Sequence, residues 1–215
     1  MRYTSVLFDL DGTLLDTLGD LTAAMNRTLT RHGLPERTRQ QMRAALGNGA
    51  RRLMELSVPA GTDSALFETL LAEYNADYAA HCRIETAPYP GVAALLLKLH
   101  AQGRKLAIVS NKPDEAVRAL RAEFFADTVP IAVGEKQGIR RKPAPDTLLA
   151  AMEQLSADPD KTVFVGDSEV DIATARAANL PCISVLWGFR DRDVLERAGA
   201  QQFAADIAQL QALLG

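Results

Sequence analysis

Two carboxylates stand two residues apart near the start of the chain, in the segment FDLDGTLLDT at residues 8–17. Asp9 and Asp11 follow a short apolar run. If that run is a strand, its period of two sends both side chains to the same side of the backbone. Like charges so close repel, and one is pushed toward its protonated form unless a cation lies between them. Such a pair suits a reactive site, although Asp and Gly are also typical of an acidic turn.

Three further polar clusters follow apolar runs or precede helical ones. They are Ser110-Asn111-Lys112, Lys142-Pro143-Ala144-Pro145, and Gly166-Asp167-Ser168 with Asp171 four residues beyond Asp167. Each one alone is typical of a polar loop, an extended connector or a capped helix start. Four such clusters, each placed after a strand or before a helix, are hard to explain in that way.

The carboxylates together suit a hard cation. Mg²⁺ prefers oxygen ligands, keeps several waters and uses one or two protein carboxylates, for which Asp9 and Asp167 are a suitable pair. Asp171, one helical turn beyond Asp167, could orient a ligand or a water without binding the metal itself. Lys142 would balance the charge of a phosphoryl group. The Ser110 side chain and backbone amides at 10–13 and 110–112 could hold its remaining oxygens.

The two aspartates of the first cluster can divide the work of phosphoryl transfer. Asp9, beside the metal, would stay ionised and attack phosphorus to form an aspartyl-phosphate. Asp11 would be the neutral partner that gives a proton to the leaving oxygen and later takes one from water. Electrostatic stabilisation by the metal and Lys142 would supply much of the rate.

Strands and helices alternate in the part of the sequence that would position these residues. Continuous apolar runs at 5–11, 105–111, 162–167 and 181–187 predict strands buried on both faces, as in a parallel sheet. Helices are expected at 91–100, 145–155 and 168–178. The alternation predicts an α/β fold with a doubly wound, Rossmann-like parallel sheet, in which ligands bind at the carboxyl ends of the strands.

A long helical interruption separates the first predicted strand from the second. Two apolar stripes at helical spacing run through it, Leu18-Leu21-Met25-Leu29 and Phe67-Leu70-Leu71-Tyr74-Tyr78. Turn-forming breaks occur at 32–35, 47–49 and 58–63. The segment is long enough to form a small helical bundle of its own. We therefore expect a core domain of residues 1–16 and 89–215 with an inserted all-helical cap domain at 17–88.

Charge is uneven inside this interruption. Seven arginines and one acid lie between residues 27 and 52, whereas six acids and one base lie between residues 55 and 85. Two solvated helix faces of opposite sign that partly neutralise each other would explain this pattern. The alternative is that one or two arginines face an anionic substrate.

Composition excludes several classes of function. Lys plus Arg total 24 and Asp plus Glu total 27, giving a net charge of −3, which does not support binding to nucleic acid or a polybasic membrane role. No apolar run is long enough to span a bilayer, and the first carboxylate comes too early for a signal peptide. The two cysteines, Cys82 and Cys182, form no ligand cluster. The sequence predicts a reduced, cytoplasmic enzyme.

At these residues the sequence resembles the haloacid dehalogenase superfamily of phosphohydrolases. FDLDGTLLD matches its first motif, SNK its second, KPAP its third and GDSEVD its fourth. The resemblance implies a Rossmann-like core, an essential Mg²⁺, an aspartyl-phosphate intermediate and a C1-type helical cap. It further implies that Asp9 is nucleophile and metal ligand, and that Asp11 is general acid and base and a ligand through its carbonyl. Lys142 would stabilise the intermediate, and Asp167 would bind metal, supported by Asp171 and Ser168.

Within the superfamily the sequence is most similar to the phosphoglycolate-phosphatase-like group, through GNGARRLM, SNKP, KPAPDTLL and VLWGFR. Thr13, Ser110 and Asn111 would then bind the phosphate. Asn48, Gly49 and Arg51 could meet the substrate, or could form only a helix–helix turn followed by a solvated arginine. Asp11 argues against a dehalogenase, which needs no acid for a halide. It also argues against a phosphonate hydrolase, which uses a Schiff-base lysine, and residues 17–87 contain no lysine.

The expected function is Mg²⁺-dependent hydrolysis of a small anionic phosphomonoester, with phosphoglycolate as the leading substrate. Pyrophosphatase, sugar-phosphate phosphatase and phosphomutase activities are the alternatives. A receiver-like signalling domain also combines aspartates, a Ser or Thr, a Lys and Mg²⁺, but it needs neither the insertion nor Asp11. The expected partners include no nucleic acid and no membrane. The oligomeric state, monomer or homodimer, is left open.

Overall fold

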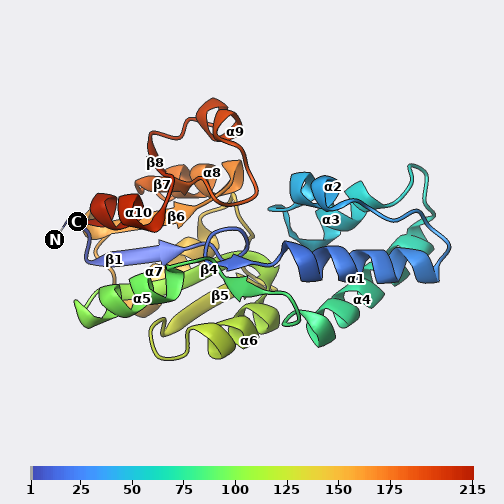
Figure 1. Cartoon of the computed structure of the whole chain (residues 1–215), viewed down its shortest axis with the longest axis horizontal. Helices are drawn as coiled ribbons and strands as arrows, with labels where there is room; N and C mark the ends of the chain where they lie inside the picture. The colour runs from blue at the N-terminus through green and yellow to red at the C-terminus, as the bar shows by residue number, and fades with distance from the viewer. Residues whose placement is uncertain (1) are drawn as a thin grey trace. The chain divides into compact units, whose positions relative to one another are not determined.

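A computed structural model describes residues 2–215, which divide into two compact units (Figure 1). The first unit contains the residues up to Asp16 together with Pro88–Gly215, and the second contains Thr17–Ala87. The chain leaves the first unit after β2 (Leu15–Asp16) and returns through β3 (Ala87–Pro88), and these two short strands pair with each other.

A six-stranded parallel sheet forms the centre of the first unit, in the order β5-β4-β1-β6-β7-β8. Its strands are β1 (Ser5–Phe8), β4 (Lys105–Pro113), β5 (Ile131–Glu135), β6 (Thr162–Gly166), β7 (Cys182–Val185) and β8 (Gln202–Ala204). The chain first builds the sheet outward from β1 through β4 to β5, and then returns to β6 on the other side of β1. This is the doubly wound α/β fold that the sequence predicts.

Helices cover the sheet on both faces, as right-handed crossovers require when the direction of winding reverses (Figure 1). The helices of this unit are α5 (Val92–Ala101), α6 (Asp114–Phe124), α7 (Asp146–Leu155), α8 (Glu169–Ala177), α9 (Arg192–Arg197) and α10 (Ile207–Leu214), with a 3₁₀ turn at Pro159–Lys161. Leu7, Val109 and Phe164 of the sheet form one buried cluster with Leu148 of α7 and Ala175 of α8. Burial on both faces explains the unbroken apolar runs of the central strands.

The first strand is shorter than the sequence predicts. It ends at Phe8 rather than Asp11, because the chain turns into a tight loop in which the amides of Leu14 and Leu15 both donate to the Leu10 carbonyl. Gly12 adopts φ +84°, a left-handed conformation that favours glycine. Strands β5 and β8 are not predicted from the sequence, because these short strands at the two edges of the sheet carry weaker apolar patterns.

The second unit is helical, with α1 (Leu18–Arg31), α2 (Arg39–Ala45), α3 (Gly49–Ser57) and α4 (Ser64–His81). These helices are interrupted at the three predicted breaks. Helix α1 packs along α4, and the predicted stripes supply buried side chains on both, including Met25 and Leu29 of α1 and Leu70 and Tyr74 of α4. Thr38 caps α2 through a capping box, and Asp63 accepts from two amides at the start of α4.

The oppositely charged segments of the helical unit pair with each other. Arg27 and Arg31 both contact Asp77, at 2.5 and 3.0 Å, and Arg51 contacts Glu68 at 2.7 Å. A longer contact of 3.8 Å joins Arg39 to Glu85. This supports the first explanation of the charge pattern, that faces of opposite sign neutralise each other.

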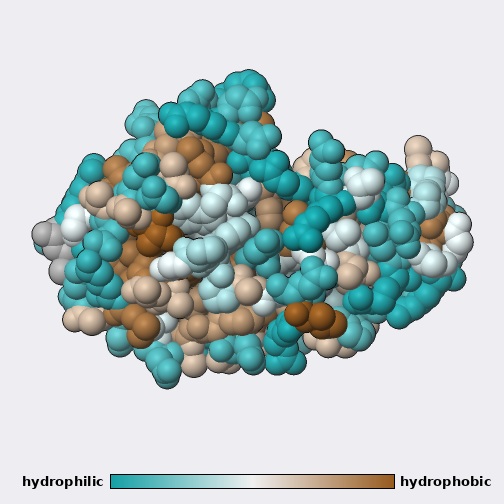
Figure 2. Space-filling view, viewed as in Figure 1, coloured by the Kyte–Doolittle hydropathy of each residue, from teal (hydrophilic) through white to brown (hydrophobic). Residues whose placement is uncertain are grey.

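The face seen in Figure 2 carries mainly hydrophilic residues, with small separate hydrophobic areas. Large exposed apolar side chains, such as Leu56 and Leu149, are scattered along the chain. None of the helices in residues 2–215 combines the length and the apolar character that a membrane crossing requires.

Candidate active site

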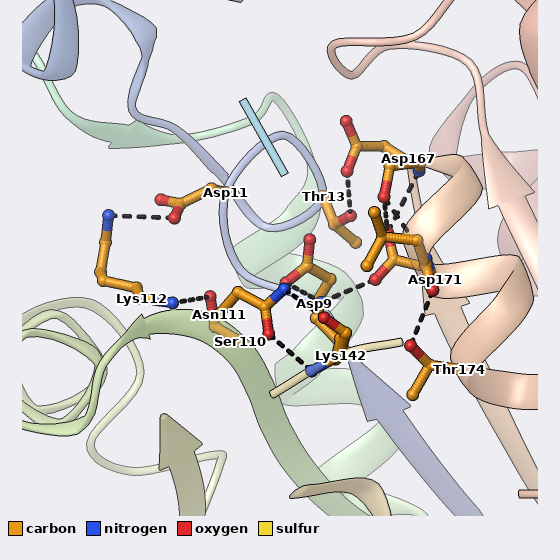
Figure 3. A network of polar contacts seen from close by, with 12 residues as sticks. Asp9, Asp11, Thr13, Ser110, Asn111, Lys112, Lys142, Asp167, Asp171 and Thr174 are labelled. Carbon is orange, nitrogen blue, oxygen red and sulfur yellow. Dashed lines mark hydrogen bonds and ion pairs between the residues drawn. The ribbon is translucent and has the colours of Figure 1, made fainter. Parts of the chain in front are cut away.

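The predicted site residues gather at the carboxyl ends of β1, β4 and β6 (Figure 3). Strands β1 and β6 are neighbours, and the chain leaves them in opposite directions, toward β4 and toward β7. The position between them is therefore the topological switch point, where open α/β sheets bind their ligands. Asp9 follows β1 and Asp167 follows β6, so two carboxylates flank that point.

Three buried carboxylates form the centre of the site. Oxygen atoms of Asp9, Asp167 and Asp171 all lie within 4.8 Å of one another, and the residues are 7%, 1% and 0% exposed. Burial, together with the charges of Asp171 and Asp167, raises the pKa of Asp9 well above its usual value. Burial and the charge of Asp171 also raise the pKa of Asp167, to about 7. The electrostatics of this cluster therefore favour a cation among the carboxylates.

Lys142 supplies one positive charge to the cluster. Its ammonium group donates to Asp9 Oδ1 at 2.8 Å and to Asp171 Oδ1 at 2.7 Å (Figure 3). Burial alone would lower the pKa of Lys142, but the charges of Asp171 and Asp9 outweigh it and raise the pKa. The lysine is thus held as an ammonium ion beside the predicted nucleophile.

Asp171 and Ser168 position the lysine and the first turn of α8. The Ser168 hydroxyl donates to Asp171 Oδ2 at 2.6 Å. The Asp171 amide donates to the Ser168 hydroxyl and the Ser168 amide donates to Asp171 Oδ2, so the pair also forms a capping box. The other Asp171 oxygen holds Lys142. Gly166 permits this approach, since a Cβ there would lie 2.4 Å from the Asp171 side chain.

Both oxygens of Asp167 are held by the chain. The Thr13 hydroxyl donates to Oδ1 at 3.3 Å, and the Phe189 amide donates to Oδ2 at 2.7 Å. Two glycines allow the surrounding backbone to come this close. A Cβ at Gly12 would lie 2.4 Å from Asp167 Oδ2, and one at Gly188 would lie 2.3 Å from Asp167 Cβ.

The loop after β7 completes the site, although the sequence predicts no role for it. Besides the Phe189 amide, it supplies the indole N–H of Trp187, which donates to the Thr13 carbonyl at 3.1 Å. Arg190 pairs with Glu169, the first residue of α8, through two contacts of 2.7 and 3.0 Å. The VLWGFR segment was used above only as one of the segments that resemble the phosphoglycolate-phosphatase-like group. Its Trp187-Gly188 pair shortly after an apolar strand was the signal that could have identified it.

Asp11 does not share the surroundings of Asp9. Because β1 ends at Phe8, the period of two does not continue, and Asp11 forms an ion pair with Lys112 at 2.9 Å instead (Figure 3). The like charges that raise the pKa of Asp9 are those of Asp171 and Asp167. The expectation that Asp9 and Asp11 repel each other from one side of a strand is therefore wrong. The use of the Asp11 carbonyl as a metal ligand stays a prediction.

Three residues predicted to bind phosphate have structural contacts within the site. The Asn111 amide group accepts from the Lys142 backbone N–H at 2.8 Å and donates to the Lys142 carbonyl at 2.9 Å, so it positions that lysine. The Thr13 hydroxyl faces Asp167, as described above. Ser110 Oγ accepts from the Lys112 amide at 3.3 Å, and its own hydroxyl proton remains available for a phosphoryl oxygen.

The residues at the switch point fit a magnesium ion. Asp9, Asp167 and Asp171 offer only carboxylate oxygens, which are the ligands that Mg²⁺ prefers. Both oxygens of Asp171 accept at 2.6–2.7 Å from Lys142 and Ser168, whereas Asp167 Oδ1 accepts only the longer 3.3 Å contact from Thr13. Asp9 and Asp167 are therefore the better placed pair of ligands. Three buried carboxylates beside one ammonium group leave an excess of negative charge that a divalent cation would balance.

The predicted substrate contacts of the helical unit lie around the start of α3. Asn48 immediately precedes this helix and Gly49 is its first residue, with φ +79°. Arg51 forms a two-contact ion pair with Glu68 and lies over the Phe67 ring, 5.4 Å from its centroid. A substrate contact by Arg51 would compete with Glu68, and roles for all three residues stay predictions.

Comparison with known proteins agrees with the arrangement at the strand ends. The family model of the haloacid dehalogenase-like hydrolases matches residues 6–185. The chain belongs to this family. Its relatives include a phosphoglycolate phosphatase of Xanthomonas campestris pv. campestris, 35% identical over 192 residues that cover 88% of this chain and 86% of the relative.

Two other members of the family widen this comparison. An N-acetylmuramic acid 6-phosphate phosphatase of Pseudomonas aeruginosa is 34% identical over 88% of this chain and 84% of its own length. The crystal structure of a provisionally assigned phosphoglycolate phosphatase from Lactobacillus delbrueckii subsp. bulgaricus superimposes with a TM-score of 0.94 at 36% identity. It covers 100% of this chain and 99% of that one. The predicted superfamily and fold are therefore confirmed.

Proposed function

We propose that the protein is a Mg²⁺-dependent phosphatase that hydrolyses a small phosphomonoester through an aspartyl-phosphate on Asp9. The observation that carries the proposal is the Asp9 carboxylate itself. It is buried at the switch point, one of its oxygens is held by Lys142, and Asp167 and Asp171 lie within metal-binding distance of it. Membership of the hydrolase family and the phosphatase names of the relatives support the same reaction.

In this proposal the residues of the cluster divide the work, and Asp9 is both nucleophile and metal ligand. An oxygen of Asp9 attacks phosphorus, and Lys142 holds the other and offsets negative charge on the transferred group. Asp167 and Asp9 would hold the metal, while Thr13 and Phe189 fix the orientation of Asp167. When bound, Mg²⁺ supplies charge stabilisation to the phosphoryl oxygens. Asp11 gives a proton to the leaving oxygen and takes one from the water that cleaves the acyl-phosphate.

Phosphoglycolate is the leading substrate, because several relatives at 34–35% identity are named for it and cover most of this chain. A sugar phosphate is a second candidate, because the P. aeruginosa relative, named for N-acetylmuramic acid 6-phosphate, is equally similar. Either substrate would have to be recognised partly by residues outside the core cluster, with Asn48 and Gly49 as our candidates.

A metabolite panel tests this proposal. The full chain is assayed with Mg²⁺ against phosphoglycolate, N-acetylmuramic acid 6-phosphate, other sugar phosphates, nucleotides and pyrophosphate. We expect Asp9→Asn to lower kcat by about 10³-fold or more, because the amide is a poor nucleophile. Acid-quenched turnover should trap phosphate on the wild-type protein and not on this variant. Asp160→Asn, at an exposed aspartate of the 3₁₀ turn, is the control. Full activity of Asp9→Asn would refute the assignment of the nucleophile.

A further inference from the structure

Lys112 makes a contact in the site that the reaction described above does not use. Its side chain is 3% exposed, and its ammonium group lies 2.9 Å from Asp11 Oδ2. In Figure 3 the two lysines of the site point to different carboxylates, Lys142 to Asp9 and Asp171, and Lys112 to Asp11. Because this buried lysine contacts the predicted general acid, Lys112 is a candidate for a separate role in the reaction.

The end of β4 holds Lys112 firmly. The pairing of β4 with β5 shifts its register between Val109 and Pro113, which turns this end of the strand relative to its regular part. The Lys112 amide donates to Ser110 Oγ, and its carbonyl packs against Gly134, where a Cβ would lie 2.7 Å from it. The Gly134 amide also donates to Asp114 at 2.9 Å. The position of the lysine is therefore set by backbone contacts on both sides.

The two oxygens of Asp11 differ in their surroundings. Oδ2 faces the ammonium group of Lys112, whereas Oδ1 is buried and has no hydrogen-bond partner among residues 2–215. An ammonium group has three donors and no acceptor, so the oxygen in contact with it must act as an acceptor. Oδ1 is consequently the oxygen that this contact leaves for a ligand. A buried polar atom without a partner is rare and calls for a ligand.

We propose that Lys112 is a positioning residue for Asp11, which it orients so that Oδ1 is the atom that exchanges protons with the substrate. This inference rests on the proposed phosphatase function. Lys112 holds Oδ2, restricts rotation of the carboxyl group and leaves Oδ1 for the ester oxygen. The arrangement matches the requirement that a general acid lie within hydrogen-bond reach of the atom that it protonates.

In the first half of the reaction, an oxygen of Asp9 forms a bond to phosphorus while the bond from phosphorus to the ester oxygen breaks. The ester oxygen keeps the electron pair and takes the proton from Asp11 Oδ1, leaving Asp11 ionised. In the second half, water attacks phosphorus, its proton goes to Asp11 Oδ1, and the bond between phosphorus and Asp9 breaks to regenerate the carboxylate.

Direct binding of the substrate phosphoryl group by Lys112 is the alternative role, and the two roles predict different kinetics. A positioning residue acts only through Asp11, so its loss should matter most where the leaving oxygen needs a proton. A residue that binds the phosphoryl group would be needed equally for every ester. Leaving-group dependence therefore separates the two roles, whereas a change in overall activity does not.

The test compares Lys112→Met, Lys112→Arg, Asp11→Asn and the double variant Lys112→Met/Asp11→Asn in the full chain with Mg²⁺. Each is assayed on p-nitrophenyl phosphate, phenyl phosphate and an alkyl phosphate. We expect Lys112→Met to lower kcat/KM for the alkyl ester by about 10²-fold and to leave p-nitrophenyl phosphate within a few-fold of wild type. Lys112→Arg should restore part of the loss. In the Asp11→Asn background, Lys112→Met should add no further loss, since coupled residues are not additive.

Lys105→Met is the matched control, because Lys105 lies on the same strand at the opposite end from the site. A uniform loss across the three esters, or a full additional loss in the double variant, would overturn the positioning role while leaving the phosphatase proposal intact. Wild-type protein that hydrolyses none of the esters or panel metabolites would overturn both. Thermal melting of every variant identifies losses caused by unfolding, and the Arg variant provides a second test if the Met variant does not fold.

Discussion

At the scale of single residues, the site is governed by the burial of like charges. Asp9, Asp167 and Asp171 are held together with a single lysine among them, and the raised pKa values of Asp9 and Asp167 express the cost of keeping both ionised. The chain keeps Asp171 and Lys142 paired with each other and orients Asp167 through Thr13 and Phe189. What remains is a pair of carboxylates oriented toward a cation.

Removal of one of these carboxylates should weaken metal binding directly. We expect Asp167→Asn to lower the affinity for Mg²⁺ by about 10- to 100-fold or more, because changes even outside the direct ligands of a metal cost this much. Isothermal titration calorimetry with Mg²⁺ alone measures the effect, without reference to activity. The wild-type protein should also melt at a higher temperature with Mg²⁺ than after EDTA treatment, and Asp167→Asn should lose most of that shift. An unchanged titration curve for Asp167→Asn would contradict the metal assignment.

At the scale of elements, short loops between strands and helices hold the site together. The loop at Gly12 and the loop at Gly188 approach each other so closely that a Cβ at Gly188 would lie 2.4 Å from the Gly12 carbonyl oxygen. This close approach brings the Phe189 amide to Asp167 and the Trp187 indole to Thr13. The loop after β7 therefore acts as a support for the metal ligand.

A methyl group at Gly188 should disturb this support. We expect Gly188→Ala to lower kcat/KM by about 10-fold or more and to reduce the free energy of unfolding by about 1–3 kcal/mol, because an overpacked site must shift its backbone. Urea unfolding and Mg²⁺ titration measure the two effects. Gly61→Ala is a useful control, since no atom lies within 4 Å of the added Cβ and only its φ of +83° is strained. That variant should lose about 1 kcal/mol and keep its activity.

The strands and helices with strong local sequence patterns could be predicted from the sequence, whereas contacts between distant residues could not. The four continuous apolar runs and the helices at 91–100, 145–155 and 168–178 are found within a few residues of their predicted bounds, because buried strands and capped helices leave clear signals. The pairing of Asp11 with Lys112, and of Asn111 with the Lys142 backbone, could not be predicted. Both depend on where a strand ends and how a loop turns, which tertiary contacts decide. The edge strands β5 and β8 were missed because their apolar patterns are weaker.

At the scale of the whole chain, stability is distributed over two compact units with different chemistry. The sheet unit depends on buried apolar strands, whereas the helical unit combines two apolar stripes with many ion pairs. Among the ion pairs of the helical unit, those made by Asp77 have the most buried carboxylate. Its side chain is 3% exposed and contacts Arg27 and Arg31, which are themselves partly exposed.

Acid should weaken the helical unit through Asp77. Burial alone would raise the pKa of Asp77, but hydrogen bonds and charge from Arg27, with Arg31 and His81, lower it below its usual value. A lowered pKa stabilises the fold above the unfolded value of about 4, and this stabilisation is lost as the pH falls through the folded value. We expect Asp77→Asn to cost about 1–2 kcal/mol near pH 7 and progressively less below about pH 4. Urea unfolding of both proteins across this range measures the difference. A constant difference at every pH would contradict the ion-pair explanation.

The contact between Trp187 and the Thr13 carbonyl has a practical consequence. Trp187 is the only tryptophan in the sequence, and it lies in the sheet unit beside the loop that carries Asp9. Its fluorescence is therefore an intrinsic probe of the surroundings of that loop, with no label to introduce. Unfolding followed by tryptophan emission monitors the sheet unit, whereas circular dichroism monitors the helices of both units. A comparison of the two curves shows whether the units unfold together.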